Sequence, residues 1–278
     1  MLASMSEERE TVMIAAFSGW NDACQSATNA IHQLIDAYDA REIRRISCDG
    51  YYDYQVSRPT LCRVSGHARI VWPQTTFYEV VLPSGMHCYV QLAPEPNYRW
   101  REYCQQSLSI ASELGVDRII TLGSMFADCA HTRPLPVGIC DDMDCNSECD
   151  GGEYDGPVGI PTVLEAMARE ESFAGTSIWV SVPQYMGNDD CPMGALALLN
   201  ALGSKLGVAF DAGKLTKETR EWQAKASMLV RCSNQLGDYV HHLEEDWDKA
   251  EHAKEACEND PHKVDQLVHE AEEFLKKF

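Results

Sequence analysis

Several loops of this sequence combine carboxylate, histidine, arginine and aromatic side chains, which are the groups that bind anions and transfer protons. Most of them follow a short apolar run that we expect to form a strand. In an open α/β sheet, ligands bind in the loops beyond the carboxyl ends of the strands. The candidate residues of a pocket or an interface are Gly19, Trp20, Asn21, Asp22, Tyr52, Asp53, Arg58, Glu95, Asn97, Arg99, Asp128, His131, Thr132, Arg133, Tyr154 and Tyr185.

Two interpretations of these side chains are open. In the first, Arg58, Arg99 or Arg133 pairs with a phosphate or carboxylate of a nucleotide-like ligand. His131 with Asp128 would then transfer a proton. In the second, the same residues make capping, interdomain and subunit hydrogen bonds. We favour the second, because the chain has neither a Gly-x-Gly-x-x-Gly nor a Gly-x-x-x-x-Gly-Lys-Ser/Thr phosphate loop, and no Gly-x-Ser-x-Gly nucleophile elbow. We therefore assign no catalytic residue and expect no cofactor.

A separate acidic segment has the spacing of a cation site. Its oxygen-bearing residues match positions 1, 3, 5, 7, 9 and 12 of a calcium-binding loop. They are Asp142, Asp144, Asn146, Glu148, Asp150 and Glu153. The sixth position, however, is Ser147, where the calcium loop requires glycine. Cys140, Cys145 and Cys149 could instead hold zinc, although their spacing matches no zinc knuckle. We expect a solvated acidic loop with no metal.

Apolar runs and helical periodicities predict the elements that position these loops. We expect strands at about residues 11–17, 43–48, 68–72, 77–82, 87–92, 118–122 and 178–182. We expect helices at about residues 23–35, 98–114, 160–171 and 193–206. This alternation predicts a three-layer α/β/α domain with a largely parallel sheet and an antiparallel hairpin near residues 68–92.

The composition changes from about residue 211, where strand signals end and charged residues dominate. Apolar positions from Trp222 to Ala250 recur alternately every four and three residues, which is the spacing of a coiled-coil-like seam. Asn259-Asp260-Pro261 then ends this helix and starts another. We expect a C-terminal helical hairpin that either packs on its own domain or makes subunit contacts. The predicted division is an α/β/α domain at 1–210 and a helical extension at 211–278.

The charge and composition exclude several classes of function. The 278 residues carry 43 Asp and Glu against 23 Lys and Arg, a net charge of −20. So acidic a surface repels nucleic acid. The chain has no run of 18 apolar residues, and Glu7, Glu8 and Glu10 occupy the place where a signal peptide would be basic. We therefore expect a cytoplasmic protein with no membrane segment, in which most of the twelve cysteines are reduced.

Six ordered motifs carry a resemblance to a known family. They are Phe17-Ser18-Gly19-Trp20-Asn21-Asp22-Ala23, Tyr51-Tyr52-Asp53-Tyr54-Gln55 with Arg58-Pro59, Glu95-Pro96-Asn97-Tyr98-Arg99-Trp100, Asp128-Cys129-Ala130-His131-Thr132-Arg133-Pro134, Tyr154-Asp155-Gly156-Pro157 and Trp179-Val180-Ser181-Val182-Pro183-Gln184-Tyr185. In this order they resemble the proteasome assembly chaperone 2 family, and most closely its actinobacterial branch. The resemblance extends from about residue 11 to the C-terminal helices.

The resemblance implies a phosphorylase/hydrolase-like α/β/α domain with a helical extension, in proteins that form homo-oligomers, with a trimer favoured. Eukaryotic relatives help to assemble proteasome α-rings, and some archaeal relatives bind core particles through a C-terminal hydrophobic-Tyr-any motif. This chain ends in Lys276-Lys277-Phe278 and departs from that tail. We therefore expect a non-enzymatic assembly or scaffold protein with a possible protein partner. The alternative is a small-molecule enzyme, either a nucleoside phosphorylase or hydrolase or, by family label, an ATP-grasp-type ligase.

Overall fold

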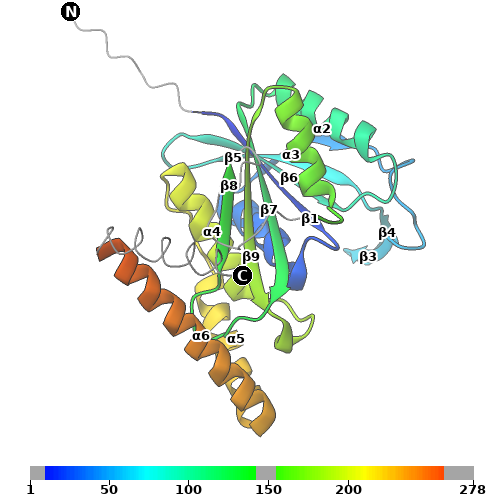
Figure 1. Cartoon of the computed structure of the whole chain (residues 1–278). Coiled ribbons are helices and arrows are strands. Elements are labelled where there is room, and N and C mark those ends of the chain that lie inside the picture. Colours follow the sequence, from blue (N-terminus) through cyan, green and yellow to red (C-terminus); the bar gives the residue numbers. More distant parts are fainter. Residues whose placement is uncertain (1–9, 142–154, 260–278) are drawn as a thin grey trace, which may run out of the picture.

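The computed structural model describes residues 10–141 and 155–259, which form a central sheet covered by helices (Figure 1). The seven-stranded sheet has the order β2-β5-β6-β1-β7-β9-β8. Its strands are β1 (Val12–Ser18), β2 (Arg41–Ile46), β5 (Thr75–Val81), β6 (His87–Pro94), β7 (Arg118–Ala127), β8 (Val137–Asp141) and β9 (Ala174–Pro183). The four middle strands, β6, β1, β7 and β9, are parallel, whereas β5, β2 and β8 are antiparallel to their neighbours. The predicted mostly parallel sheet with an antiparallel hairpin is confirmed.

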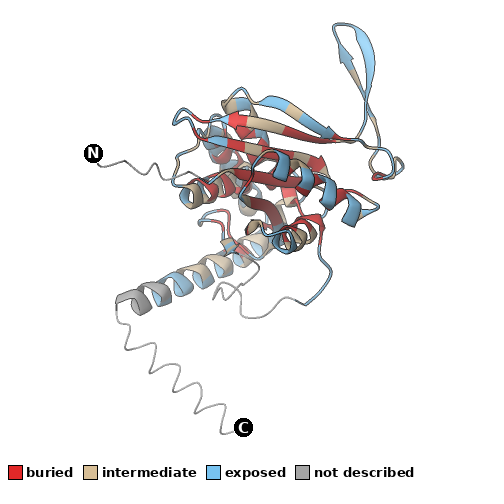
Figure 2. Ribbon diagram, turned by 90° about the horizontal axis from the view of Figure 1, so that it is seen from above, coloured by how far each residue is buried: buried red, intermediate tan, exposed pale blue. Residues whose placement is uncertain are grey.

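Helices cover both faces of this sheet and bury its middle strands. Helices α1 (Ser26–Ala37) and α4 (Pro192–Leu206) pack on one face, and α2 (Trp100–Glu113) and α3 (Ile160–Glu170) pack on the other. Figure 2 shows the buried strands between these two layers. Residues 12–17 of β1 are fully buried on both faces, which explains why that strand is apolar without alternation. The predicted α/β/α fold is therefore confirmed.

The strand predictions are incomplete at two places. Residues 68–72 do form a strand, β4 (His67–Val71), but it does not join the main sheet, because it pairs only with an unpredicted strand, β3 (Thr60–Val64), to form a separate hairpin. The sequence signal for β3 is weak, since none of its residues is buried and its apolar positions are interrupted by arginine. The short strand β8 was also missed, because it lies at the sheet edge in an exposed, proline-flanked segment.

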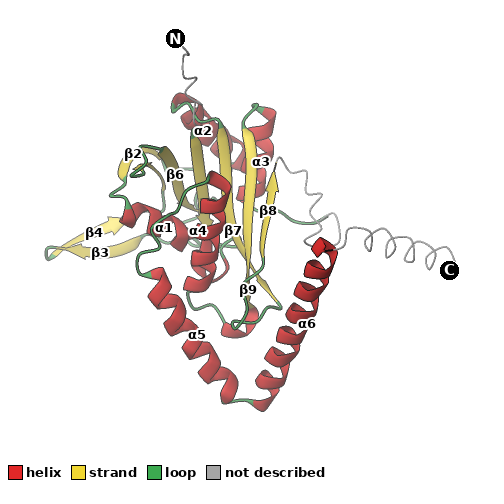
Figure 3. Cartoon of the chain, turned by 90° about the vertical axis from the view of Figure 1, so that its left-hand side faces the viewer, coloured by secondary structure: helices red, strands yellow, loops and turns green. Residues whose placement is uncertain are grey.

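The C-terminal helices differ from the prediction in where the chain reverses. Helix α5 (Leu215–Arg231) ends at Cys232, and α6 (Asn234–Asn259) starts after Ser233, so the predicted continuous seam is split (Figure 3). The Ser233 hydroxyl accepts a hydrogen bond from the Leu236 N–H at 3.3 Å and helps to start α6. Trp222 belongs to the main core of the protein. The predicted break at 259–261 falls at the end of the described residues and beyond. Within the described ranges, none of the helices has the length and apolar character needed to cross a membrane.

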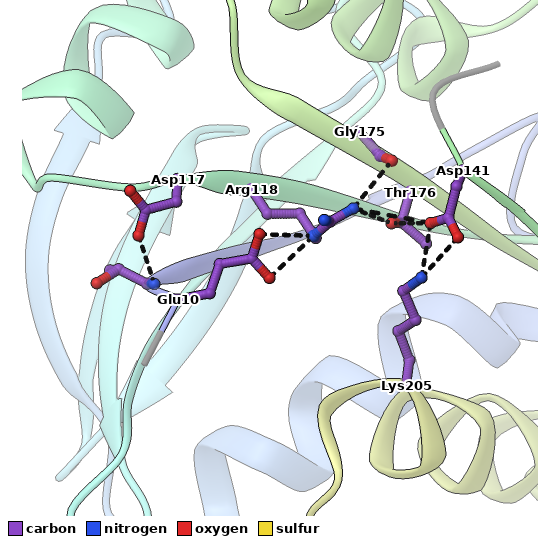
Figure 4. A network of polar contacts seen from close by, with 8 residues as sticks. Glu10, Asp117, Arg118, Asp141, Gly175, Thr176 and Lys205 are labelled. Atoms are coloured by element: carbon purple, nitrogen blue, oxygen red, sulfur yellow. Dashed lines mark hydrogen bonds and ion pairs between the residues drawn. The ribbon is translucent and has the colours of Figure 1, made fainter. Parts of the chain in front are cut away.

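A polar network connects the elements at the end of the sheet where the parallel strands begin (Figure 4). The Arg118 guanidinium donates to Glu10 at 2.9 Å and to the Thr176 hydroxyl at 3.0 Å. Asp141, the last residue of β8, accepts two 2.7 Å hydrogen bonds from the Lys205 ammonium of α4. The network ties β7, β9, β8 and α4 together, and it leaves the predicted site loops at the opposite end.

Candidate functional site

Glu95 joins three elements at the carboxyl end of the sheet. Its Oε1 accepts a hydrogen bond from Asn21 Nδ2 at 2.8 Å and another from the Ile160 N–H at 3.0 Å. The end of β1, the end of β6 and the start of α3 therefore meet at one carboxylate. Gly159 packs so closely on Asn21 that a Cβ there would lie 2.1 Å from Asn21 Oδ1. That oxygen is buried and has no hydrogen-bond partner within residues 10–141 and 155–259.

Asp22 holds the start of α1. Its carboxylate accepts hydrogen bonds from the Ala27 N–H at 2.8 Å and from the Thr28 hydroxyl at 2.5 Å. Burial raises the pKa of Asp22, and the hydrogen bonds from Thr28 and Ala27 act in the opposite direction. The carboxylate is thus used to cap a helix. Its neighbours Gly19 and Trp20 are exposed.

A second group of the predicted residues ties the loop after β2 to the loop after β6. Asn97 Oδ1 accepts a hydrogen bond from the Asp53 N–H at 2.8 Å, and Tyr98 Oη donates to Asp53 Oδ2 at 2.9 Å. Hydrogen bonds from the Gln55 N–H and the Tyr98 hydroxyl lower the pKa of Asp53. The buried Tyr52 hydroxyl donates to the Pro94 carbonyl at 3.2 Å. These contacts fix the two loops against each other.

Arg99 belongs to the same region but is already paired. Its guanidinium donates to Glu102 in the first turn of α2 and lies over the ring of Tyr51, 5.4 Å from the centroid. The hydrogen bond to Glu102 raises the pKa of Arg99. The side chain therefore secures the start of α2.

His131 lies where the sheet meets the helical extension. It is 1% exposed, and its backbone N–H donates to the Tyr185 hydroxyl at 2.8 Å. That hydroxyl lies 2.7 Å from His131 Nδ1, and Ser227 Oγ of α5 lies 3.0 Å from Nε2. Burial lowers the pKa of His131, so the neutral ring is favoured. Because the Tyr185 hydroxyl accepts from the His131 N–H, we assign its own proton to the contact with Nδ1; the neutral ring is then protonated on Nε2 and donates to Ser227. Neither ring nitrogen is free to contact a substrate.

The neighbouring polar residues bind α6. Arg133 donates from Nε and Nη2 to the two carboxylate oxygens of Asp248 at 2.7 and 2.8 Å. Thr132 donates to Glu244, one helical turn before Asp248. Asp128 accepts a 2.5 Å hydrogen bond from the Tyr239 hydroxyl. Three predicted residues are therefore used to hold the extension on the end of the sheet.

The structure does not assemble the predicted residues into one polar pocket. The pairing of His131 with Asp128 that the first interpretation required is not formed, since each binds other partners. Arg99 is paired with Glu102 of α2, whereas Arg133 is paired with Asp248 of α6, so the two guanidinium groups do not bind at one site. Arg58 is exposed on the loop before β3. Tyr154 and the acidic segment from Asp142 to Glu153 lie outside the described residues.

Sequence reasoning missed the residues of the extension that complete these contacts. They are Ser227, Tyr239, Glu244 and Asp248. Glu244 and Asp248 are four residues apart and so lie on the same face of α6, which is a signal that the sequence did contain. Ser227 and Tyr239 gave no such signal, because a single polar residue on a helix does not reveal its partner.

The described residues at this end of the sheet do not include a cluster suited to a metal ion. No group of three or more His, Cys, Asp or Glu side chains there is arranged to hold a metal ion in the part of the chain that the structure describes. Two cavities of about 510 and 310 Å³ lie beside the C-terminal end of α4, and no predicted site residue lines either of them. Cys140 forms a disulfide, whereas eight other cysteines are free thiols: Cys24, Cys48, Cys62, Cys88, Cys104, Cys129, Cys191 and Cys232.

The fold and this site define an α/β/α protein whose helical extension is held against the carboxyl end of its sheet by polar loops. Residues 16–230 match the model of the PAC2 family. The chain belongs to this family.

Solved structures agree with that assignment. A proteasome-assembly chaperone homologue of Mycobacterium tuberculosis is 31% identical with a TM-score of 0.75, over 82% of this chain and 99% of that one. A PAC2 family protein of Streptomyces avermitilis is 32% identical with a TM-score of 0.75, over 83% and 100%. An archaeal proteasome activator of Pyrococcus furiosus shares the fold at 15% identity, with a TM-score of 0.62 over 80% and 93%. A comparison with curated proteins finds no match.

Proposed function

We propose that this protein is a non-enzymatic, homo-oligomeric assembly or scaffold protein of the proteasome-assembly-chaperone type, acting in the cytoplasm, with a trimer as the favoured state. The family supports this, since similar structures bear the names of a proteasome-assembly chaperone homologue and a proteasome activator. The observation that carries the proposal is the use of His131, Arg133 and Asp128 in binding α5 and α6. The side chains best suited to acid–base chemistry or anion binding are engaged in holding a helical extension in place.

The proposal has two separate tests. Light scattering of the purified full chain measures the oligomer against the 31.1 kDa mass of one copy, and we expect a stable trimer. A single-copy mass at all accessible concentrations would contradict the homo-oligomer. Affinity purification of tagged chain from its own cells, quantified by mass spectrometry, tests the partner. We expect proteasome core subunits at a reproducible ratio, and the absence of any reproducible stoichiometric partner would contradict the assembly role.

One observation favours the alternative, a small-molecule binder or enzyme of the nucleoside phosphorylase, hydrolase or ligase kind. The buried Asn21 Oδ1 has no hydrogen-bond partner within the described ranges, and it lies beside Gly159 at the start of α3. An unpaired buried acceptor is unfavourable and is satisfied when a ligand donates to it. A thermal-shift screen with nucleosides and nucleotides tests this, because a ligand at 100 times its dissociation constant stabilises a protein by about 2.7 kcal/mol. A screen without any shift would exclude the alternative, as would hits that persist unchanged in Asn21→Ala.

A further inference from the structure

The hairpin of β3 and β4 stands away from the rest of the molecule (Figures 2 and 3). Each strand pairs only with the other, and none of the residues in either strand is buried. A two-stranded hairpin without a third strand or a packed face is marginally stable in water. We call this hairpin, residues 60–71, the arm.

Both faces of the arm carry apolar side chains that its own chain leaves uncovered. Leu61 and Ile70 are directly opposite each other on one face and are 57% and 53% exposed. Val64 and Val71 lie on the other face and are exposed as well, and Trp72 follows at the base of the arm. Exposed apolar side chains gathered on one small element are typical of a protein–protein contact.

The charge of the arm is opposite to that of the protein. Residues 55–78 contain Arg58, Arg63 and Arg69 and have no Asp or Glu. The rest of the chain therefore carries the whole acidic excess behind the net charge of −20. A basic, apolar arm on an acidic protein is complementary to the surface of another copy of the same chain, because opposite potentials across an interface steer and orient association.

The outer surface of the helical extension has the character that the arm requires. Met228 and Leu229 on α5 are 68% and 44% exposed. Exposed acids, among them Asp238, Glu245 and Glu251, line the neighbouring helix α6. On α5 the exposed Lys225 and Arg231 flank Met228 and Leu229, whereas acids outnumber bases on α6. The negative charge that complements the arginines of the arm therefore lies on α6, and the exposed apolar side chains lie on α5.

We propose that the arm of one protomer docks on the outer surface of α5 and α6 of a second copy. The inference rests on the homo-oligomer of the proposed function and names the surfaces that form it. The two surfaces differ, so the interface is heterologous, and such an interface closes into a ring when the rotation between copies permits. A trimer is then three arms, each bound to the extension of the next protomer.

The first test reverses the charge of the arm in the full-length protein. In Arg63→Glu/Arg69→Glu, we expect the dissociation constant of the oligomer to rise about 100-fold, because like charges facing each other across an interface are strongly unfavourable. Analytical ultracentrifugation over a dilution series measures the constant, and circular dichroism checks that the variant is folded. The control Arg44→Glu/Arg101→Glu makes the same change of net charge on exposed residues of β2 and α2, and we expect it to keep the wild-type constant.

The second test maps the contact. Leu61→p-benzoylphenylalanine places a photoreactive group on the arm, and a mixture with isotope-labelled chain distinguishes crosslinks between copies from those within one. We expect crosslinks to α5 or α6 of the other copy. Crosslinks elsewhere, or to no second copy, would overturn the proposed contact.

The outcomes separate this inference from the proposed function. If the wild-type chain is a monomer at every concentration, the homo-oligomer of the proposed function fails and the arm contact fails with it. If the wild type is an oligomer and Arg63→Glu/Arg69→Glu associates equally well, the arm contact alone is wrong. An arm that binds another protein or an acidic polymer would likewise leave the charge-reversed chain oligomeric.

Discussion

Two glycines on either side of Trp179 give the sharpest test of the packing around β9, the strand that leads to Tyr185. In the sheet, Gly123 of β7 and Gly138 of β8 are both in register with Trp179 of β9. A Cβ on Gly123 would lie 2.6 Å from the Trp179 ring, whereas a Cβ on Gly138 would meet no atom within 4 Å. The same substitution by alanine should therefore have opposite effects at the two positions.

The magnitudes follow from these distances. Carbon atoms in ordinary contact are about 3.5–4.0 Å apart, so Gly123→Ala requires the Trp179 ring to move by about 1 Å. Such overpacking costs about 1–3 kcal/mol, and a strand gains about 0.5–1 kcal/mol when alanine replaces glycine. We expect Gly123→Ala to lower the free energy of unfolding by about 1–2 kcal/mol. Gly138→Ala should raise it by about 0.4–1 kcal/mol, because alanine restricts the unfolded chain.

Urea denaturation and thermal melting measure both effects. For a protein of this size, 1 kcal/mol corresponds to a change in melting temperature of about 2–4 °C. If the clash is with the indole, Gly123→Ala should cost little in a Trp179→Leu background, and the two changes should be strongly non-additive. A clash between Gly123 and the indole is contradicted if both glycine variants shift the free energy of unfolding in the same direction, or if the cost of Gly123→Ala is unchanged in the Trp179→Leu background.

Three further predictions concern the loops at the carboxyl end of the sheet. Gly159→Ala should destabilise the protein by about 2 kcal/mol in urea denaturation, since its Cβ would overlap Asn21, and Asn21→Ala should restore most of the loss. Since burial lowers the pKa of His131 below that of the unfolded chain, the unfolded state binds a proton first as the pH falls through about 6.5. The denaturation midpoint should therefore drop between pH 7.5 and 5.5, and an equal drop in His131→Gln would contradict this account. Arg133→Ala should speed hydrogen exchange in α6, whereas Lys249→Ala should not, because Lys249 forms ion pairs with Glu245 and Asp246 of α6 itself. Equal exchange rates in the two variants would show that Arg133 does not hold the helix.

The sequence predicted the layers of this protein because the core strands and helices carry strong local signals. Residues 12–17 are continuously apolar, which is expected only of a strand covered on both faces. Strands β3 and β8 were missed because neither contributes a buried face, and the period-2 pattern that reveals a strand comes from such a face. The chain reversal at Ser233 was missed because the apolar spacing continues through it.

The candidate residues were found by their types, but their partners depend on tertiary contacts. The sequence placed His131, Arg133 and Asp128 in one loop at the end of a strand. Their partners in α5 and α6 lie between 92 and 115 residues further along the chain, as the bonds from Gln223 to the His131 carbonyl and from Arg133 to Asp248 illustrate. No local pattern connects positions so far apart.

The sequence by itself determined the fold class, the family and the acidic character of this protein, because periodicity, ordered motifs and charge are properties of the chain. Only the tertiary structure decided that the polar loops hold a helical extension and that a basic arm stands uncovered beside an acidic body. The physical reason is that the role of a side chain depends on what surrounds it. Both ring nitrogens of His131 are hydrogen-bonded, so this histidine makes structural contacts. The strands β3 and β4 pair only with each other, so their side chains stay exposed.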